Sequence, residues 1–229
     1  HFFGGIRKVL SHPAEHPLSR ACSPQSVLQN AKNRIIKPFT ALALCKFYNL
    51  YYNIQKYKAA DFINFCDAYD IPVLSLTNVK GYAADVRSEK SIAKAVAKLT
   101  YAFANANVPK VNVITGEAYG SAYVTMNSKA LGADVTYAWP DASIGMMDAN
   151  EAAKIMYADD IAKSADVQSV ISEKAAEYAA LQSGVESAAA RGYVDTIINP
   201  EDTRKYVAAA FEMLYTKRED RPDKKHGTV

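Results

Sequence analysis

Three strand-like apolar runs alternate with helical patterns in the middle of the chain, and this order limits the fold more than any other feature. The runs are "IPVLSLTN" (71–78), "VPKVNVIT" (108–115) and "ADVTYAWP" (133–140). The segments between them, about 88–107 and 121–131, have apolar residues at helical spacing. Strands that alternate with helices are joined by right-handed crossovers and form a parallel sheet. The pattern therefore predicts an α/β fold.

Further helices and strands are predicted on both sides of this core. "KAADFINFCDAYD", residues 58–70, places apolar side chains on one broad face and predicts a helix. "ASIGMM", residues 142–147, predicts a fourth and shorter strand. The remaining segments are predicted to be mainly helical, over 149–160, 168–182, 185–191 and 201–217, with a small strand or extended edge over 194–198.

The charge of the chain is distributed unevenly, and the change occurs near Tyr57. The whole sequence has 27 basic and 24 acidic residues, but residues 1–57 hold eight of the basic ones and only one acid. That segment therefore carries +7 and the remainder −4. The basic residues are scattered and form no nucleic-acid-binding motif, so no nucleic-acid partner is predicted. We interpret residues 1–57 as an atypical basic extension, disordered or rearranged, beside a domain formed by residues 58–229.

Membrane and secretory signals are weak in this sequence. No apolar run reaches the roughly 18 residues that a membrane span needs. The first ten residues, "HFFGGIRKVL", do not resemble a signal peptide. Three cysteines are too few for a disulfide framework and favour a reducing compartment. The sequence therefore predicts a cytoplasmic location.

"GEAYGSAYVTMNSK", residues 116–129, contains the most conspicuous candidate for chemistry. A nucleophile elbow at Ser121 needs glycine two positions before and two positions after it, where this chain has Tyr119 and Tyr123. The usual histidine base is also missing, because the C-terminal three-quarters of the chain has one histidine, His226, in a charged tail. A hydrolase with a serine nucleophile is therefore not favoured.

Two other kinds of site are disfavoured by spacing. A short-chain dehydrogenase pairs a tyrosine with a lysine four residues later, but the residue four after Tyr123 is Asn127, and Lys129 lies six away. No G-x-G-x-x-G motif is present for a dinucleotide. The acidic pairs of the sequence lack a third convergent ligand, so no metal site is predicted. Cys66 lies among apolar residues of a helical face, which indicates a buried structural thiol.

The backbone of the same segment offers a further interpretation. Gly120, Ser121 and Ala122 are small residues at the junction between a predicted strand and a predicted helix. The first N–H groups of a helix lack intrahelical acceptors and lie at the positive end of its dipole, so a ligand oxygen can accept from them. Small side chains would permit that approach. The same residues could instead serve only close packing of helix on strand, and the local pattern leaves both interpretations open.

Several stretches of the sequence resemble a known protein family, and they occur in the same order as in that family. They are "ADFINFCDAYDIPVLSL", "AKLTYAFANANVPKVNVITGEAYGSAYVTMNSKALGAD", "YAWPDASIGMM" and "ARGYVDTIINPEDTR" with "KREDRPDKKHG". Together, over residues 58–229, they resemble the C-terminal, biotin-side half of biotin-dependent acyl-CoA carboxyltransferase subunits, of the propionyl-CoA carboxylase beta and methylmalonyl-CoA decarboxylase alpha type. The resemblance implies a crotonase-like (ClpP/crotonase) α/β fold, a spiral of stacked β-β-α units. The spiral would be incomplete at its N-terminus, because residues 1–57 do not resemble the opening β-hairpin of the family.

The resemblance also implies an activity and a site. The family transfers a carboxyl group between biotin and an acyl-CoA. In its "Y-G-G-A-Y" pattern, backbone amides after the Tyr-Gly pair stabilise the biotin oxyanion, and these correspond to the N–H groups of Ser121 and Ala122. The end of the family's "D-V-P-G-F" turn also shapes the site. The implied catalytic and biotin-binding residues are Gly81, Tyr82, Tyr119, Gly120, Ser121 and Ala122.

Partners and cofactors follow from the same resemblance. Biotin is the implied cofactor, carried on a separate biotin carboxyl carrier protein, and an acyl-CoA is the implied substrate. The acyl-CoA would bind to a carboxyltransferase N-terminal domain, so the active form is expected to be a homo- or hetero-oligomer. A membrane decarboxylase complex would be reached only through partners.

Several positions depart from the family pattern. Ser121 replaces its second glycine, Lys80 its proline, Glu117 one residue of a usual basic pair, and Asp148 a glycine. Because of these departures two alternatives stay open. One is a non-catalytic remnant or assembly module of such a complex, and the other is a stand-alone crotonase that acts on CoA esters.

Overall fold

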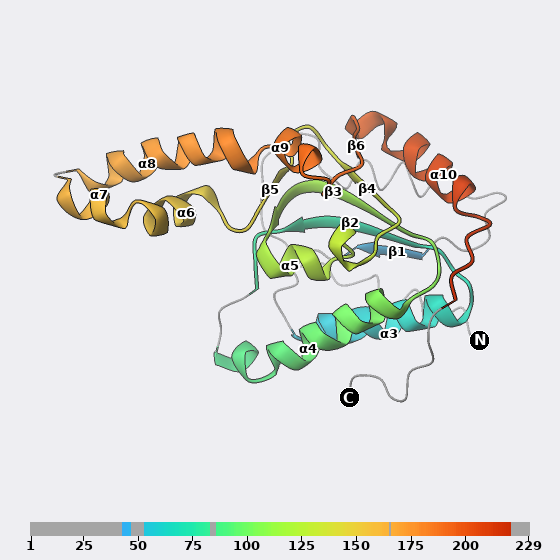
Figure 1. Ribbon diagram of the computed structural model, residues 1–229. Coiled ribbons are helices and arrows are strands. Elements are labelled where there is room, and N and C mark those ends of the chain that lie inside the picture. Colours follow the sequence, from blue (N-terminus) through green and yellow to red (C-terminus); the bar gives the residue numbers. More distant parts are fainter. Residues whose placement is uncertain (1–42, 47–52, 83–85, 165, 221–229) are drawn as a thin grey trace. The chain divides into compact units, whose positions relative to one another are not determined.

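A parallel β-sheet forms the centre of the fold (Figure 1). The computed structural model describes residues 43–46, 53–82, 86–164 and 166–220. All of them lie within the unit Ile36–Val229. Most of the basic extension predicted over 1–57, and the tail that contains His226, lie outside the described residues.

The strands pair in the order β1-β2-β3-β4-β6, and β5 pairs with the end of β3. Their bounds are Ala43–Lys46 (β1), Val73–Val79 (β2), Lys110–Tyr119 (β3), Val135–Ala138 (β4), Ser143–Gly145 (β5) and Thr196–Ile197 (β6). Each of these pairings is parallel. Parallel neighbours need long crossover connections, which the helices between the strands supply. The predicted parallel sheet is therefore confirmed.

β3 carries the chain from the sheet into the region of the predicted site. Its first half pairs with β4, whereas its last three residues pair with β5. The sequence predicts an end near Thr115, but the strand continues to Tyr119. Asn78 in β2 supports this extension, because its Oδ1 accepts a hydrogen bond from the Glu117 N–H at 3.1 Å and its amide lies against Gly116.

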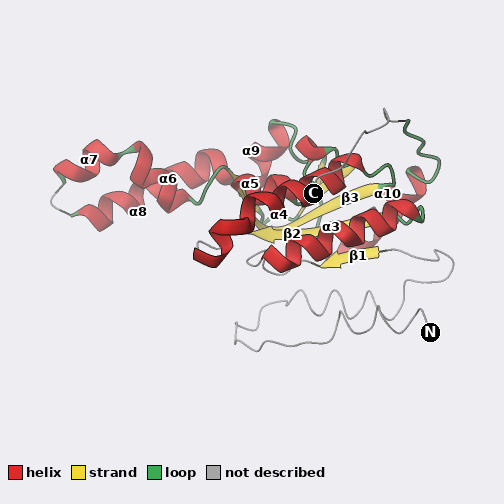
Figure 2. Cartoon of the chain, turned by 90° about the horizontal axis from the view of Figure 1, so that it is seen from below, coloured by secondary structure: helices red, strands yellow, loops and turns green. Residues whose placement is uncertain are grey.

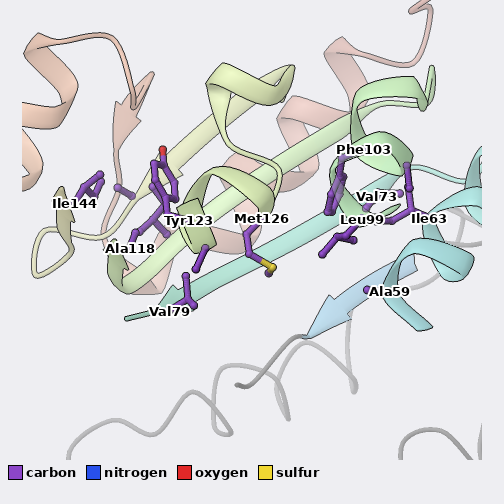
Figure 3. Packing of buried hydrophobic residues seen from close by; sticks show 14 of the residues in the cluster. Ala59, Ile63, Val73, Val79, Leu99, Phe103, Ala118, Tyr123, Met126 and Ile144 are labelled. Carbon is purple, nitrogen blue, oxygen red and sulfur yellow. The ribbon is translucent and has the colours of Figure 1, made fainter. Parts of the chain in front are cut away.

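Three helices pack on one face of the sheet. They are α3 (Asn53–Ala68), α4 (Val86–Asn105) and α5 (Gly120–Thr125). Figures 1 and 2 show α3 and α4 side by side along the sheet. The apolar cluster beneath them includes Ile63, Leu99, Phe103 and Met126 (Figure 3). Each of these side chains is enclosed, and full burial of such a side chain stabilises the fold by about 1.5–3 kcal/mol.

The opposite face of the sheet is covered by α10 (Thr203–Met213), which a short 3-10 turn, Pro200–Asp202, precedes. A second buried cluster lies there, formed by Leu74, Val111, Val113, Tyr137, Ile198, Val207, Ala210 and Phe211. The indole Nε1 of Trp139 donates to Thr203 Oγ1 at 3.0 Å and fixes the start of α10. Alternate residues of a strand face opposite sides, so both faces of this parallel sheet are buried.

A helical hairpin extends away from the sheet (Figures 1 and 2). It consists of α6 (Ala149–Met156), α7 (Ala158–Lys163) and α8 (Val167–Tyr178). A π-helical turn, Ala179–Ser183, and α9 (Val185–Ala190) follow it. The single helix predicted over 149–160 is divided at Tyr157, between α6 and α7. None of the described helices combines the length and hydropathy that crossing a bilayer requires.

α5 is shorter than the sequence predicts. The expected helix reaches Leu131, but the structure ends it at Thr125. Asn127 has a φ of 58°, and this left-handed conformation cannot continue a right-handed helix. A separate 3-10 turn, Lys129–Leu131, then leads to Gly132.

Candidate functional site

The turn from β3 into α5 depends on Gly120. Tyr119 is still extended, with φ −116° and ψ 140°, and Gly120 then takes a φ of +59°. Residues with a Cβ rarely adopt that region. A Cβ on Gly120 would also begin only 2.9 Å from the backbone oxygen of Met146. Conformation and contact therefore both require glycine here.

The two predicted amide donors follow directly after this glycine. Ser121 is exposed and Ala122 is buried, and both lie in the first turn of α5. Ser121 is not among the described non-glycine residues with positive φ, so a serine fits at this position without backbone strain. Because α5 has only six residues, its dipole is weak, and the N–H groups themselves are the main attraction for a ligand oxygen.

The turn after β2 reaches the same helix through Tyr82. The Tyr82 hydroxyl donates to the Ser121 carbonyl oxygen at 3.1 Å and lies 2.8 Å from Thr125 Oγ1. Burial raises the pKa of Tyr82, while these two hydrogen bonds act in the opposite direction. Gly81 precedes Tyr82 in the chain, and no atom lies within 4 Å of the place where its Cβ would be. Of the two predicted turn residues, Tyr82 is thus brought to α5.

Tyr119 lies on the β5 side of the junction. It pairs with Gly145, and its side chain is buried. Burial raises the pKa of Tyr119, and a hydrogen bond to Ser143 partly offsets this effect. The structure thus gathers five of the six predicted residues at the β3–α5 junction, and the sixth, Gly81, precedes Tyr82 in the chain.

Charged residues that the sequence treats as separate departures meet beside the junction. Lys80 Nζ lies 2.9 Å from Glu117 Oε1. The hydrogen bond and the charge of Glu117 raise the pKa of Lys80, and the carboxylate of Asp148 adds to the shift. Each of these three residues is visible in the sequence as a departure from the family pattern. The sequence does not reveal that they are neighbours. Met146 and Thr125 are further neighbours of the site, and no sequence pattern points to either of them.

Side-chain nucleophiles and metals gain no support from the geometry. Cys66 is buried, and burial raises the pKa of its thiol to about 11, so the reactive thiolate is scarce near neutral pH. Burial likewise raises the pKa of Tyr123 to about 12. Among the described residues, no group of three or more His, Cys, Asp or Glu side chains is arranged to hold a metal ion.

Parallel strands joined by crossover helices, and a glycine-dependent strand-to-helix turn followed by backbone donors, agree with the crotonase-like class that the sequence resemblance implies. The sequence matches the family model of the carboxyl transferase domain over residues 50–229, and the chain belongs to this family. The match begins before Lys58, and α3 likewise begins at Asn53. The domain boundary near residue 57 stays a prediction.

Known relatives agree with this assignment. The chain is 50% identical over 173 residues to a putative propionyl-CoA carboxylase beta chain of Bacillus subtilis, covering 75% of this chain and 34% of that protein. It is 44% identical over 171 residues to the methylmalonyl-CoA carboxyltransferase 12S subunit of Propionibacterium freudenreichii subsp. shermanii, covering 74% and 33%. The chain therefore spans about a third of the length of these relatives.

A solved structure of a related protein also resembles this chain in its fold. It is the transcarboxylase 12S hexamer with methylmalonyl-CoA and methylmalonic acid bound. The TM-score is 0.73 at 43% sequence identity, and the match covers 76% of this chain and 34% of that one. The crotonase-like α/β fold implied by the sequence is confirmed.

Proposed function

We propose that this chain is the biotin-side half of a carboxyltransferase that moves a carboxyl group between biotin and an acyl-CoA. The main support for this proposal is the β3–α5 junction, where Gly120 has a φ of +59° and is followed by the amides of Ser121 and Ala122. Membership of the carboxyl transferase family supports the same activity. The role of these amides is part of the proposal.

The residues present fit a biotin ureido ring. Gly120 has no side chain to obstruct the donors, and Ser121 is exposed at the start of α5. Bound biotin supplies a nitrogen that carries the carboxyl group and an oxygen on which negative charge accumulates. The N–H groups of Ser121 and Ala122 would donate to that oxygen, and one such donor lowers a barrier by about 3 kcal/mol. Backbone donors serve this purpose without a histidine base.

An acyl-CoA-binding domain is needed to complete the proposed site. The matched region spans about a third of the length of each relative, and the acyl-CoA-binding domain can belong to the same polypeptide or to a partner. Met146, beside Gly120, is 77% exposed, and Ile155 and Leu181 of the adjoining segment are 66% and 67% exposed. Such apolar exposure, at Met146 beside the junction and at Ile155 and Leu181 in the segment that follows, favours an oligomeric interface. A biotin carboxyl carrier protein is the second partner, and the location is cytoplasmic, with any membrane contact made through partners.

The test is carboxyl transfer to free biotin from methylmalonyl-CoA or malonyl-CoA as the carboxyl donor, with propionyl-CoA or acetyl-CoA as the product. The chain is assayed alone and with a separately expressed N-terminal domain of a 12S-type relative. We expect turnover only in the mixture. S121A should retain it, because the amide is unchanged, whereas S121P should lose it, because proline has no N–H. Circular dichroism of both variants controls for folding.

The remaining outcomes separate the alternatives. Stable association with the N-terminal domain without turnover would make the chain an assembly module. Binding of a CoA ester by the chain alone would support a stand-alone crotonase. Equal activity of S121A and S121P would exclude the Ser121 amide as a donor.

A further inference from the structure

Three oxygen atoms meet behind the peptide bond that joins Ser121 to Ala122. Thr125 Oγ1 donates to the Ser121 carbonyl oxygen at 2.8 Å. The Tyr82 hydroxyl lies 3.1 Å from the same carbonyl oxygen and 2.8 Å from Thr125 Oγ1. Since each hydroxyl has one proton, the Thr125 proton is directed to the carbonyl and the Tyr82 proton is shared between its two acceptors. The Ser121 oxygen thus receives two side-chain hydroxyls.

A buried cation lies on the other side of Tyr82. Lys56 Nζ is 4.2 Å from the centroid of the Tyr82 ring, and the Lys56 residue is fully buried. In the part of the chain that the structure describes, this Nζ has no hydrogen-bond acceptor. Burial lowers the pKa of Lys56, whereas the negative face of the ring favours its charged form. The ring of Tyr82 is therefore the counterpart of this ammonium.

These contacts affect the peptide that holds one of the proposed oxyanion donors. The Ser121 carbonyl and the Ala122 N–H belong to one planar peptide unit and point in opposite directions. Hydrogen bonds accepted by a carbonyl polarise its peptide, so the N–H of that unit becomes a stronger donor. The same bonds fix the orientation of the peptide plane. An ammonium over the Tyr82 ring withdraws electron density from the phenol and strengthens its O–H as a donor.

We propose that Tyr82 and Thr125 are positioning residues that orient and polarise the Ala122 N–H, and that Lys56 acts on this donor through the ring of Tyr82. This inference rests on the proposed function of the Ala122 amide. The three side chains come from α3, the turn after β2 and α5, and they join these elements behind the site.

The experiment compares matched variants of the full chain. Y82F and T125V remove one hydroxyl each and keep the shape of the side chain, whereas T125S keeps the hydroxyl. K56M removes the charge of residue 56. If K56M fails to fold, K56R, which retains the charge, is compared with the parent chain instead. Y69F is the control, because Tyr69 is 65% exposed and lies outside the site. The Ala122 amide is followed by its ¹⁵N–¹H resonance, and kcat and KM are measured with the N-terminal domain present.

We expect Y82F and T125V to shift the Ala122 resonance upfield and to lower kcat by about three- to tenfold, the range of one net hydrogen bond, without a change in KM for the acyl-CoA. T125S and Y69F should match the parent chain, and K56M should shift the resonance in the same direction as Y82F, by less. An Ala122 resonance that is unchanged in Y82F and T125V would overturn the proposal. The Ala122 resonance can be measured without turnover. Failure of carboxyl transfer in the parent chain would therefore refute the proposed function, while the resonance would still show whether Tyr82 and Thr125 polarise the Ala122 N–H.

Discussion

The backbone oxygen of Met146 lies 2.9 Å from the point where a side chain on Gly120 would begin. This contact joins the strand-to-helix junction of the site to the segment between β5 and α6. Gly120 has a φ of +59° as well, so its lack of a side chain serves two separate purposes. The two can be distinguished with a second glycine, because Gly192 has a φ of +80° but no atom within 4 Å of its Cβ position.

G120A should destabilise the fold more than G192A does. The left-handed conformation costs about 1–2 kcal/mol in either variant, and only G120A must in addition displace the Met146 segment. We expect the free energy of unfolding in urea to fall by that amount in G192A and by more in G120A. Carboxyl transfer should be lost in G120A alone. Equal losses of stability in the two variants would show that the contact with Met146 contributes nothing to the cost of G120A.

The sheet and its order could be predicted from sequence because alternating strands and helices leave few topologies. The end of α5 could not, since a single residue decides it. Asn127 takes a φ of 58°, and the apolar periodicity that predicts a longer helix contains no information about one backbone angle. The extension of β3 escaped prediction for a related reason, because Asn78 supports it from 39 positions away.

The site was predictable in part. The family pattern points to the β3–α5 junction and to the turn that contains Tyr82. The hydrogen bond from Tyr82 to the Ser121 carbonyl and the proximity of Lys56 to the Tyr82 ring arise only from tertiary packing. Lys80 and Glu117 were visible as departures from the pattern, but their pairing depends on the register between β2 and β3.

Two ion pairs should differ in the coupling energy of their partners. Lys80 and Glu117 are 66% and 37% exposed, and exposed pairs contribute about 0–1 kcal/mol. Lys217 and Asp134 lie 2.9 Å apart with side chains only 13% and 18% exposed, so water screens them less. Double-mutant cycles in urea, with K80M and E117Q for the first pair and K217M and D134N for the second, should give the larger coupling for the second. A larger coupling for Lys80 and Glu117 would contradict the argument from burial.

D195A should destabilise the connection between β4 and β6. Asp195 Oδ2 accepts from the Thr136 N–H at 2.8 Å and from Lys129 Nζ at 2.8 Å. Thr136 is fully buried, so removal of the carboxylate leaves its N–H without this acceptor, at a cost of about 1–3 kcal/mol. D195N retains an oxygen and should lose less. Chemical denaturation measures both, with D141N at an exposed position as control, and equal losses in D195A and D195N would contradict this assignment.

The Cys66 thiol should make stability depend on pH in the alkaline range. Burial, with a smaller contribution from Asp67, raises the pKa of Cys66 from 9.0 to about 11 in the folded chain. The unfolded chain therefore loses this proton first, and unfolding releases a proton between those two values. The stabilising contribution is complete below pH 9 and is lost as pH rises toward about 11. Urea unfolding of the parent chain and of C66A at a series of pH values measures the effect. C66A should have a flatter profile over this window, whatever its stability at pH 7, and parallel profiles would show that the folded chain does not protect the thiol from ionisation.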